Sequence, residues 1–175
     1  MPFFPSLPDD ASTVEIFAAH PDIYRYFGDV VNAILRGPSP LTPGERELIG
    51  AFVSGVNSCD YCAGGHRAAA EAFGIDHAVF DALMQDIASA PVSDRLKPLL
   101  AYVLKLTKTP SRMVQADADA VFRAGWDEKA LHDAIAVCCH FNFMNRLVAG
   151  HGIEANPAKF LERGQKHFRQ GYLKR

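Results

Sequence analysis

Four side chains whose types suit thiol chemistry lie close together in the sequence. Glu47, Cys59, Cys62 and His66 follow the spacing Glu-x11-Cys-x2-Cys-x3-His. Residues three and four apart are neighbours on one face of an α-helix, so a helix through this segment places both sulfurs beside the histidine ring. A modest distortion of the first helical turn permits a disulfide between the two cysteines.

The chemistry of such a cluster depends on the pKa of its thiols, because the thiolate is the reactive form. Unpaired backbone N–H groups and the helix dipole at a helix N-terminus stabilise a thiolate. His66 can deprotonate a thiol or pair with its thiolate, and Glu47, folded back from a preceding helix, can orient the imidazole. The cluster therefore predicts a dithiol redox site.

Two cysteines and a nearby histidine are also three of the four ligands that zinc prefers, and Glu47 could supply the fourth. His66 lies only four residues after Cys62, and no fourth ligand is fixed by the spacing. We therefore favour the redox interpretation and assign neither a metal nor a cofactor. Stoichiometric zinc in the purified protein would contradict this choice.

A second cysteine pair, Cys138 and Cys139, differs because its members are adjacent. On a helix they point about 100° apart, so we predict two small buried apolar residues and no second redox pair. The polar residues that follow, Asn142, Asn145 and Arg146, are predicted to have structural roles. Four cysteines are too few for a secreted disulfide scaffold of this length.

The elements that must position the first cluster are helices. A capping box with proline at the first helical position, Thr42-Pro43-Gly44-Glu45, predicts a helix that runs to about Asn57. Ser58 is predicted to cap the next helix, which begins at Cys59 and ends near Gly74.

The rest of the chain has the same character, because prolines and glycines separate segments with apolar residues at helical spacing. Alternating strand patterns with hairpin turns are absent from the sequence. We therefore predict an all-α fold, a single domain with short helix–helix loops. Further helices are expected within 13–35, from 76, and over 94–109, 114–123 and 127–150.

Composition narrows the function. The chain has 175 residues, 49% hydrophobic and 22% charged, with a formal net charge of −2. These values fit one compact soluble domain and give no reason to expect a nucleic-acid partner. The longest nearly uncharged stretch, residues 134–144, is too short for a bilayer, and residues 1–11 lack a signal peptide's pattern. We predict a cytoplasmic protein without a membrane partner.

Three regions are predicted along the chain. Residues 1–11 contain three prolines and are expected to form an extended N-terminal arm. Residues 12–160 are expected to form the helical domain. The remaining residues, 161–175, are expected to be a basic C-terminal tail in solvent, because the segment 159–175 carries six basic residues and one glutamate.

The surroundings of the cysteine pair resemble a known family. Residues 47–66 read E-L-I-G-A-F-V-S-G-V-N-S-C-D-Y-C-A-G-G-H, with Leu41-Thr42-Pro43-Gly44-Glu45-Arg46 before them and the segment Phe141–Leu147 further on. Over roughly residues 10–160 the chain resembles the AhpD-like alkylhydroperoxidase and carboxymuconolactone decarboxylase superfamily. The likeness is to the peroxidase-related branch that keeps both cysteines. It implies an AhpD-like helical bundle.

The resemblance also implies roles. Cys62 would be the peroxidatic thiolate that becomes a sulfenic acid, Cys59 would resolve it to a disulfide, and His66 with Glu47 would relay protons. An external dithiol, typically a lipoylated protein or another small redox protein, would restore the thiols. Family members form homo-oligomers, so a trimer or hexamer is expected. The best-known members carry a histidine where this chain has Tyr61, which is a poor proton acceptor at neutral pH.

The predicted function is a thiol-dependent peroxidase that reduces hydroperoxides. One alternative is a carboxymuconolactone decarboxylase-like lyase, since such members do not rely on the cysteine pair. The other is a non-catalytic redox sensor or assembly module in which the cysteines only report redox state.

Overall fold

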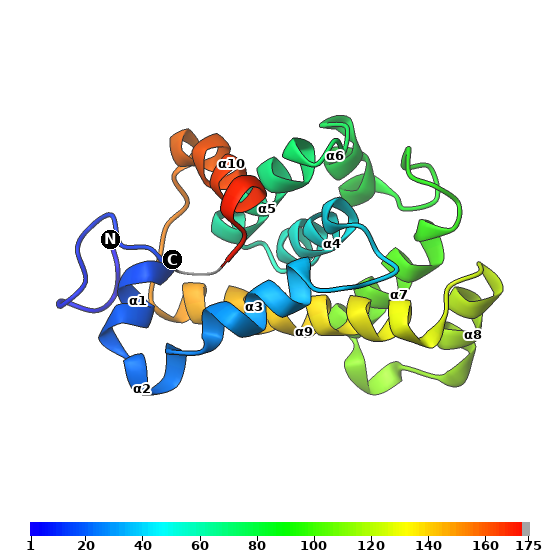
Figure 1. Ribbon diagram of the computed structural model, residues 1–175, viewed down its shortest axis with the longest axis horizontal. Coiled ribbons are helices and arrows are strands. Elements are labelled where there is room, and N and C mark those ends of the chain that lie inside the picture. The colour runs from blue at the N-terminus through cyan, green and yellow to red at the C-terminus, as the bar shows by residue number, and fades with distance from the viewer. Residues whose placement is uncertain (173–175) are drawn as a thin grey trace.

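The computed structural model of the protein describes residues 1–172, and within this range every regular element is a helix, with no strand (Figure 1). The all-α prediction is therefore confirmed. The α-helices are α1 (Thr13–Ala19), α2 (Pro21–Tyr24), α3 (Phe27–Arg36), α4 (Pro43–Val56), α5 (Asp60–Ala72), α6 (Ala78–Gln85), α7 (Leu96–Lys108), α8 (Gln115–Arg123), α9 (Glu128–Gly150) and α10 (Phe160–Gln170), with two short 3-10 helices, η1 (Pro110–Arg112) and η2 (Pro157–Lys159).

Helix α4 is the centre of the fold. The predicted capping box starts it: the Thr42 hydroxyl accepts the Glu45 N–H at 3.1 Å, and the Glu45 carboxylate accepts the Thr42 N–H at 2.7 Å. Ten of its 14 residues are buried, among them Glu47. The helix contacts α5, α6, α7 and α9, so a polar side chain on it reaches the interior of the protein.

The core lies where α4 meets α7 and the long helix α9, which crosses the lower half of the molecule in Figure 1. Phe52, Leu99 and Phe141 are among its largest fully buried side chains. Gly50 of α4 lies directly against the Phe141 ring, so a Cβ at this position would collide with it. This glycine permits the close approach of α4 and α9, which places Phe141 beside the site described below.

The turn between α4 and α5 differs from the prediction. Ser58 has a left-handed backbone with φ of +55°, and the N-cap of α5 is Cys59. The prediction that Ser58 caps this helix is wrong, because the sharp turn uses Ser58 and delays the helix start by one residue. The Cys59 N–H donates to the Ser54 carbonyl at 2.9 Å, which fixes the turn. Cys62 consequently lies in the first turn of α5.

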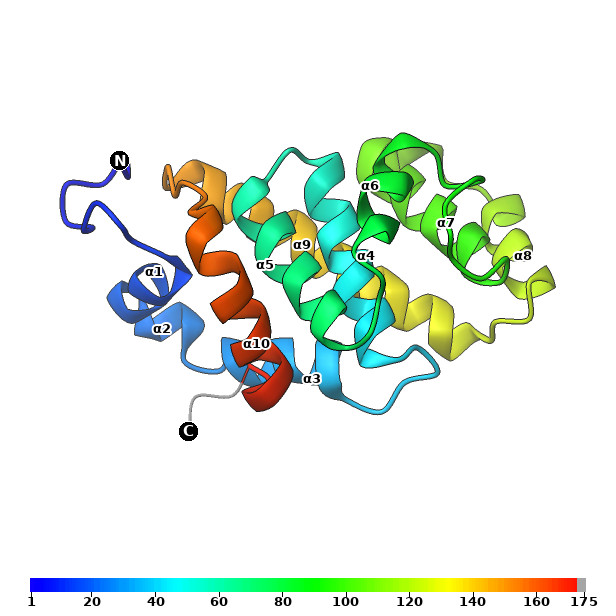
Figure 2. The same ribbon diagram turned by 90° about the horizontal axis from the view of Figure 1, so that it is seen from above.

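The C-terminal region also differs from the predicted solvated tail. Residues 160–170 form α10, which packs along α5, as Figure 2 shows from above. Gly164 lies against Ala68 and Ala69, and the Phe160 ring covers Gly64. Between its basic residues, this segment has small and apolar residues at helical spacing. They form the face of α10 that packs on α5. Three residues of the predicted tail, Leu173, Lys174 and Arg175, lie outside the described range.

Residues 1–12 contain no helix and lie against the end of α9. The Phe3 N–H donates to the His151 carbonyl at 3.0 Å, and the Phe4 ring stacks on the His151 ring with centroids 4.6 Å apart. Among residues 1–172, no helix has the length and apolar character needed to cross a membrane.

Candidate functional site

The two cysteines of the motif are buried, reduced and next to each other at the start of α5. The pKa of Cys59 is lowered to about 7, chiefly because the Cys62 thiol donates a hydrogen bond to its sulfur, although burial opposes the shift. The same hydrogen bond, with burial, raises the pKa of Cys62. The first thiolate of the pair therefore forms on Cys59, with the remaining proton on Cys62.

Glu47 and His66 form the contact that their spacing predicted. The carboxylate of Glu47 is fully buried and lies 2.6 Å from Nδ1 of His66. Burial alone raises the pKa of Glu47, but the charge and hydrogen bond of His66, with Arg36 and Tyr172, lower it to about 2. With Nδ1 directed at this carboxylate, the Nε2 atom of His66 is the one left for chemistry.

Three further residues complete this buried group, and the sequence analysis missed them. The Tyr172 hydroxyl donates to Glu47 at 2.8 Å, and Arg36 donates from Nη2 both to Glu47 and, at 3.1 Å, to the His167 carbonyl. The His167 ring stacks on His66, with centroids 5.6 Å apart and planes 6° from parallel. Helical spacing in the segment of α10 could have indicated His167, whereas no local pattern indicates Arg36 on α3 or Tyr172 after α10.

A cavity of about 650 Å³ opens in front of the motif, and Cys62 and His66 line it. Cys59 is not part of its lining. The walls come from α1 to α3 on one side and from α5, α9 and α10 on the other. Acidity therefore favours Cys59 as the resting thiolate, whereas access favours Cys62 as the sulfur that a ligand meets.

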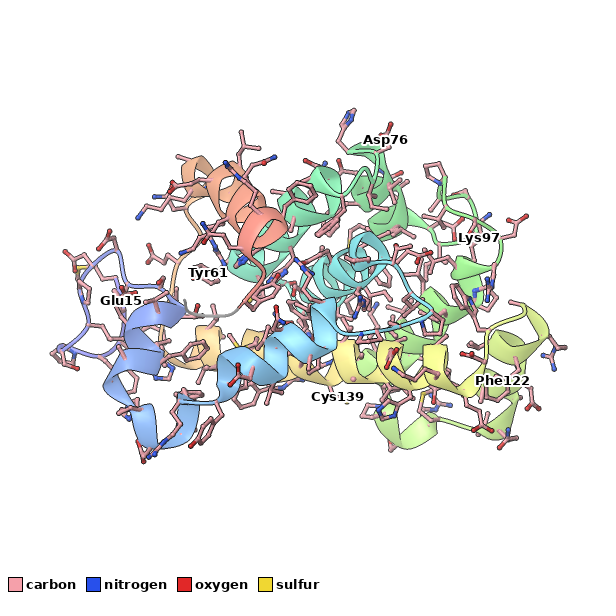
Figure 3. All side chains as sticks on the ribbon, in the orientation of Figure 1. Glu15, Tyr61, Asp76, Lys97, Phe122 and Cys139 are labelled. Carbon is pink, nitrogen blue, oxygen red and sulfur yellow. The ribbon has the colours of Figure 1, made fainter. Side chains whose placement is uncertain are left out.

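Tyr61, the residue just before Cys62, links three helices. Its hydroxyl accepts the backbone N–H of Thr13 at 3.2 Å. The Arg163 guanidinium lies 4.0 Å from the centre of its ring, and Nη1 of Arg163 donates to the Tyr61 carbonyl at 3.2 Å. Figure 3 shows Tyr61 between α1 and α10. This side chain holds the walls of the cavity together.

Asn145 of α9 braces the turn that carries the cysteines. Its Nδ2 donates to the Ser54 hydroxyl at 3.0 Å, and its Oδ1 accepts from Asn57 at 2.9 Å. Ser54 in turn accepts the Cys59 N–H through its carbonyl. Hydrogen bonding from the Asn145 side chain also lowers the pKa of both thiols, as a lesser contribution than their mutual hydrogen bond. Asn145 thus has the structural role expected for it, and that role is to hold the turn that carries Cys59.

The two cysteines of the second pair lie on different sides of α9. Cys138 is fully buried, with its sulfur 3.3 Å from the Thr107 hydroxyl, and burial raises its pKa. Cys139 is exposed on the lower side of α9 in Figure 3. The prediction that both are buried is wrong for Cys139, because it lies about 100° around α9 from Cys138, on a side of the helix that other elements do not cover.

The zinc interpretation gains no support from this geometry. Within residues 1–172, no three His, Cys, Asp or Glu side chains are arranged to hold a metal ion. Glu47, which that interpretation needs as the fourth ligand, already accepts hydrogen bonds from Arg36, His66 and Tyr172.

Comparisons with known proteins agree with the geometry. The model of the Carboxymuconolactone decarboxylase family matches residues 21–105, which include the whole four-residue motif. No curated protein matches the sequence. The solved AhpD core of an uncharacterized peroxidase-related protein from Ralstonia eutropha JMP134 is 26% identical, with a TM-score of 0.78 over 94% of this chain and 96% of that one. An uncharacterized peroxidase-related protein from Silicibacter sp. TM1040 shares the fold at 24% identity, with a TM-score of 0.73 and 92% of each chain covered.

Proposed function

Because the chain belongs to the carboxymuconolactone decarboxylase family, in the peroxidase-related branch of the AhpD-like superfamily, we propose that it reduces hydroperoxides through a Cys59–Cys62 dithiol–disulfide cycle. One observation carries this proposal. Cys62 lines a cavity with a second thiol behind it, and the His66 ring beside it is held by the buried Glu47.

In the first step the Cys62 thiol gives its proton to Nε2 of His66, and the thiolate attacks the outer oxygen of the hydroperoxide. The S–O bond forms as the O–O bond breaks, and the departing alkoxide takes the proton back from His66. The products are a Cys62 sulfenic acid and an alcohol, or water when the substrate is hydrogen peroxide. The anionic Glu47 stabilises the imidazolium that exists between the two transfers.

In the second step the Cys59 thiolate attacks the sulfenic sulfur, the disulfide forms, and hydroxide leaves to be protonated as water. The hydrogen bond from the Cys62 thiol lowers the pKa of Cys59 to about 7 in the resting pair, before Cys62 becomes a sulfenic acid. The proton that Cys59 loses on becoming the thiolate goes to the departing hydroxide. An external dithiol then returns two electrons and two protons. We expect a lipoylated protein or another small redox protein in this role, and a homo-oligomeric enzyme, trimer or hexamer, in the cytoplasm.

The test is peroxide consumption with dihydrolipoamide and other dithiols as donors. We expect Cys62→Ser to lower turnover by roughly 10³-fold, as loss of a nucleophile does. Cys59→Ser should permit one turnover and leave a sulfenic acid that a dimedone probe traps. Cys139→Ser is the matched control, because its thiol is exposed and outside the cavity, and it should leave turnover unchanged.

The same variants separate the two alternatives. A lyase would act on a carboxylated lactone, and Cys62→Ser would leave that turnover intact. A redox sensor would form the Cys59–Cys62 disulfide readily and yet consume no peroxide catalytically with any dithiol. Full peroxidase turnover in Cys62→Ser would overturn the proposed mechanism.

A further inference from the structure

The cavity in front of Cys62 has two walls of different chemistry. On one side α10 contributes Arg163, Lys166, His167 and Gln170, whose spacing of three, four and seven residues is that of one helix face. This face places two cationic side chains on the same wall, one turn apart.

The opposite wall is aromatic and comes from α1 to α3. Phe17 contacts Tyr24 with ring centroids 4.7 Å apart and Phe27 at 5.3 Å, and all three line the cavity. Phe141 and Met144 of α9 extend the apolar lining toward the sulfur. A ligand with an apolar body would bury that body against these rings.

Charge in the lining is unbalanced. Arg25, Arg163 and Lys166 face a single carboxylate, Asp29. Among residues 1–172, neither Arg163 nor Lys166 has a carboxylate within ion-pair distance. The cavity therefore has an excess of positive charge beside the cysteine.

Two histidines of the lining, His140 and His167, add little to this charge. Burial lowers the pKa of His140 to about 4 and that of His167 to about 3, with the His66 charge acting in the same direction. Both rings are consequently neutral at physiological pH. The positive charge of the cavity at that pH comes chiefly from its arginines and lysine.

The volume of the cavity favours a substrate larger than hydrogen peroxide. The cavity of about 650 Å³ lies within the range of about 300 to 1,000 Å³ that is typical of sites for larger organic ligands. One water occupies about 30 Å³ of liquid volume, and hydrogen peroxide is only one oxygen larger. Hydrogen peroxide would leave most of this space to solvent.

We propose that the preferred substrate is an organic hydroperoxide with an aromatic or apolar body and one carboxylate group. The carboxylate lies toward Arg163 and Lys166 on α10, the body lies on the aromatic wall, and the peroxide group meets Cys62. This specificity rests on the proposed function, because that function supplies the reaction at the sulfur.

The test compares cumene hydroperoxide with its para-carboxylate, two substrates that differ only in charge. We expect kcat/KM to be about 10-fold higher for the carboxylate at low salt, and the advantage to shrink as salt rises. Lys166→Gln, at an exposed position, should reduce the advantage about 3-fold. Arg169→Gln, on the same helix but outside the cavity lining, is the matched control and should preserve it. Equal efficiency for both substrates, or an unchanged ratio in Lys166→Gln, would overturn the proposal.

A binding measurement separates this inference from the peroxidase proposal. The alcohols that correspond to the two hydroperoxides can be titrated calorimetrically into Cys62→Ser, which removes the reactive sulfur. Tighter binding of the carboxylated alcohol, without turnover of either peroxide by the wild type, would support the charged cavity and contradict the peroxidase. Turnover of both peroxides with equal binding of both alcohols would support the peroxidase and overturn the substrate class.

Discussion

The two cysteine pairs contain the same residues and differ in almost everything else. Cys59 and Cys62 are three residues apart at the N-terminus of α5, in contact with each other, and Cys62 lines a cavity. Cys138 and Cys139 are adjacent in the middle of α9, one fully buried and one exposed. Spacing and place along the helix decide which thiols can work together.

The hydrogen bond between the two thiols is the chief cause of the low pKa of Cys59, and the backbone adds to the contrast between the pairs. The first turn of α5 has N–H groups without intrahelical acceptors, which favour a negative sulfur near them. In the middle of α9 these groups are used by the helix itself, and burial raises the pKa of Cys138. A cysteine in such a place behaves as a small apolar residue.

Among variants that keep all four cysteines, the largest effect is expected at Glu47, the buried carboxylate behind the first pair, which has no counterpart at the second. Glu47→Gln removes the anion that faces His66 and Arg36, so we expect a roughly 10²-fold slower reaction with peroxide. The free energy of unfolding should fall by about 3 kcal/mol, because the partly buried Arg36 loses its partner. Stopped-flow kinetics and urea denaturation measure the two effects.

Glu162→Gln is the control for that variant, because Glu162 is an exposed carboxylate on α10 outside the cavity lining. It should change neither quantity measurably. A wild-type peroxide rate in a folded Glu47→Gln protein would remove Glu47 from the mechanism.

Alkylation at different pH values contrasts the pairs directly. The pKa of Cys59 is lowered to about 7, so the first pair should react slowly with iodoacetamide below pH 7 and faster above it, as the thiolate forms. The fully buried Cys138 should react at least about 10-fold more slowly until the protein is unfolded. Mass spectrometry of the tryptic peptides identifies each thiol. A midpoint above pH 8.5 for the first pair would contradict the assignment.

Two asparagines of α9 offer a finer comparison, since each serves a different pair. Asn145→Ala removes the hydrogen bond that holds the Ser54–Cys59 turn. We expect the alkylation midpoint of the first pair to rise by about one pH unit, which corresponds to roughly 10-fold less thiolate at low pH. Asn142→Ala is the comparison variant, because its Nδ2 donates to the Cys138 carbonyl at 3.0 Å and it reaches the turn through a hydrogen bond from Asn57 at 3.2 Å, without bonding Ser54. It should leave the midpoint in place. Equal shifts in both variants would mean a general loosening of α9.

The smallest effect belongs to the second pair. Cys138→Ala removes one buried sulfur from the core, and we expect a loss of about 1 kcal/mol in the free energy of unfolding with peroxide turnover unchanged. Thermal denaturation and the peroxide assay together measure this. A drop in turnover larger than the loss of folded protein would connect the second pair to the reaction.

The sequence predicted the features that depend on local spacing. Helical periodicity and the capping box placed α4, and the interval between Glu47 and His66 predicted their contact. The N-cap at Cys59 was missed because a left-handed Ser58 depends on how tightly α4 and α5 meet.

Contacts across long intervals of chain were beyond sequence reasoning. Arg36 and Tyr172 reach Glu47 from 11 and 125 residues away, and no local pattern specifies such meetings. The net basic charge of the C-terminal segment predicted a solvated tail, but its small and apolar residues pack on α5, with Gly164 against Ala68. Tertiary packing, and not local propensity, brings these residues to the site.

The part of the site that α10 and Tyr172 contribute depends on a single connection in the chain. The connection between α9 and α10 comprises residues 151–156 and η2, and everything that α10 and Tyr172 bring to Glu47 lies beyond it. A protease that cut this connection would leave both thiols on α5, while the tyrosine hydroxyl and the cationic wall would be held only by packing. Release of that fragment would leave the dithiol of α5 open to solvent, without the cationic wall of the cavity.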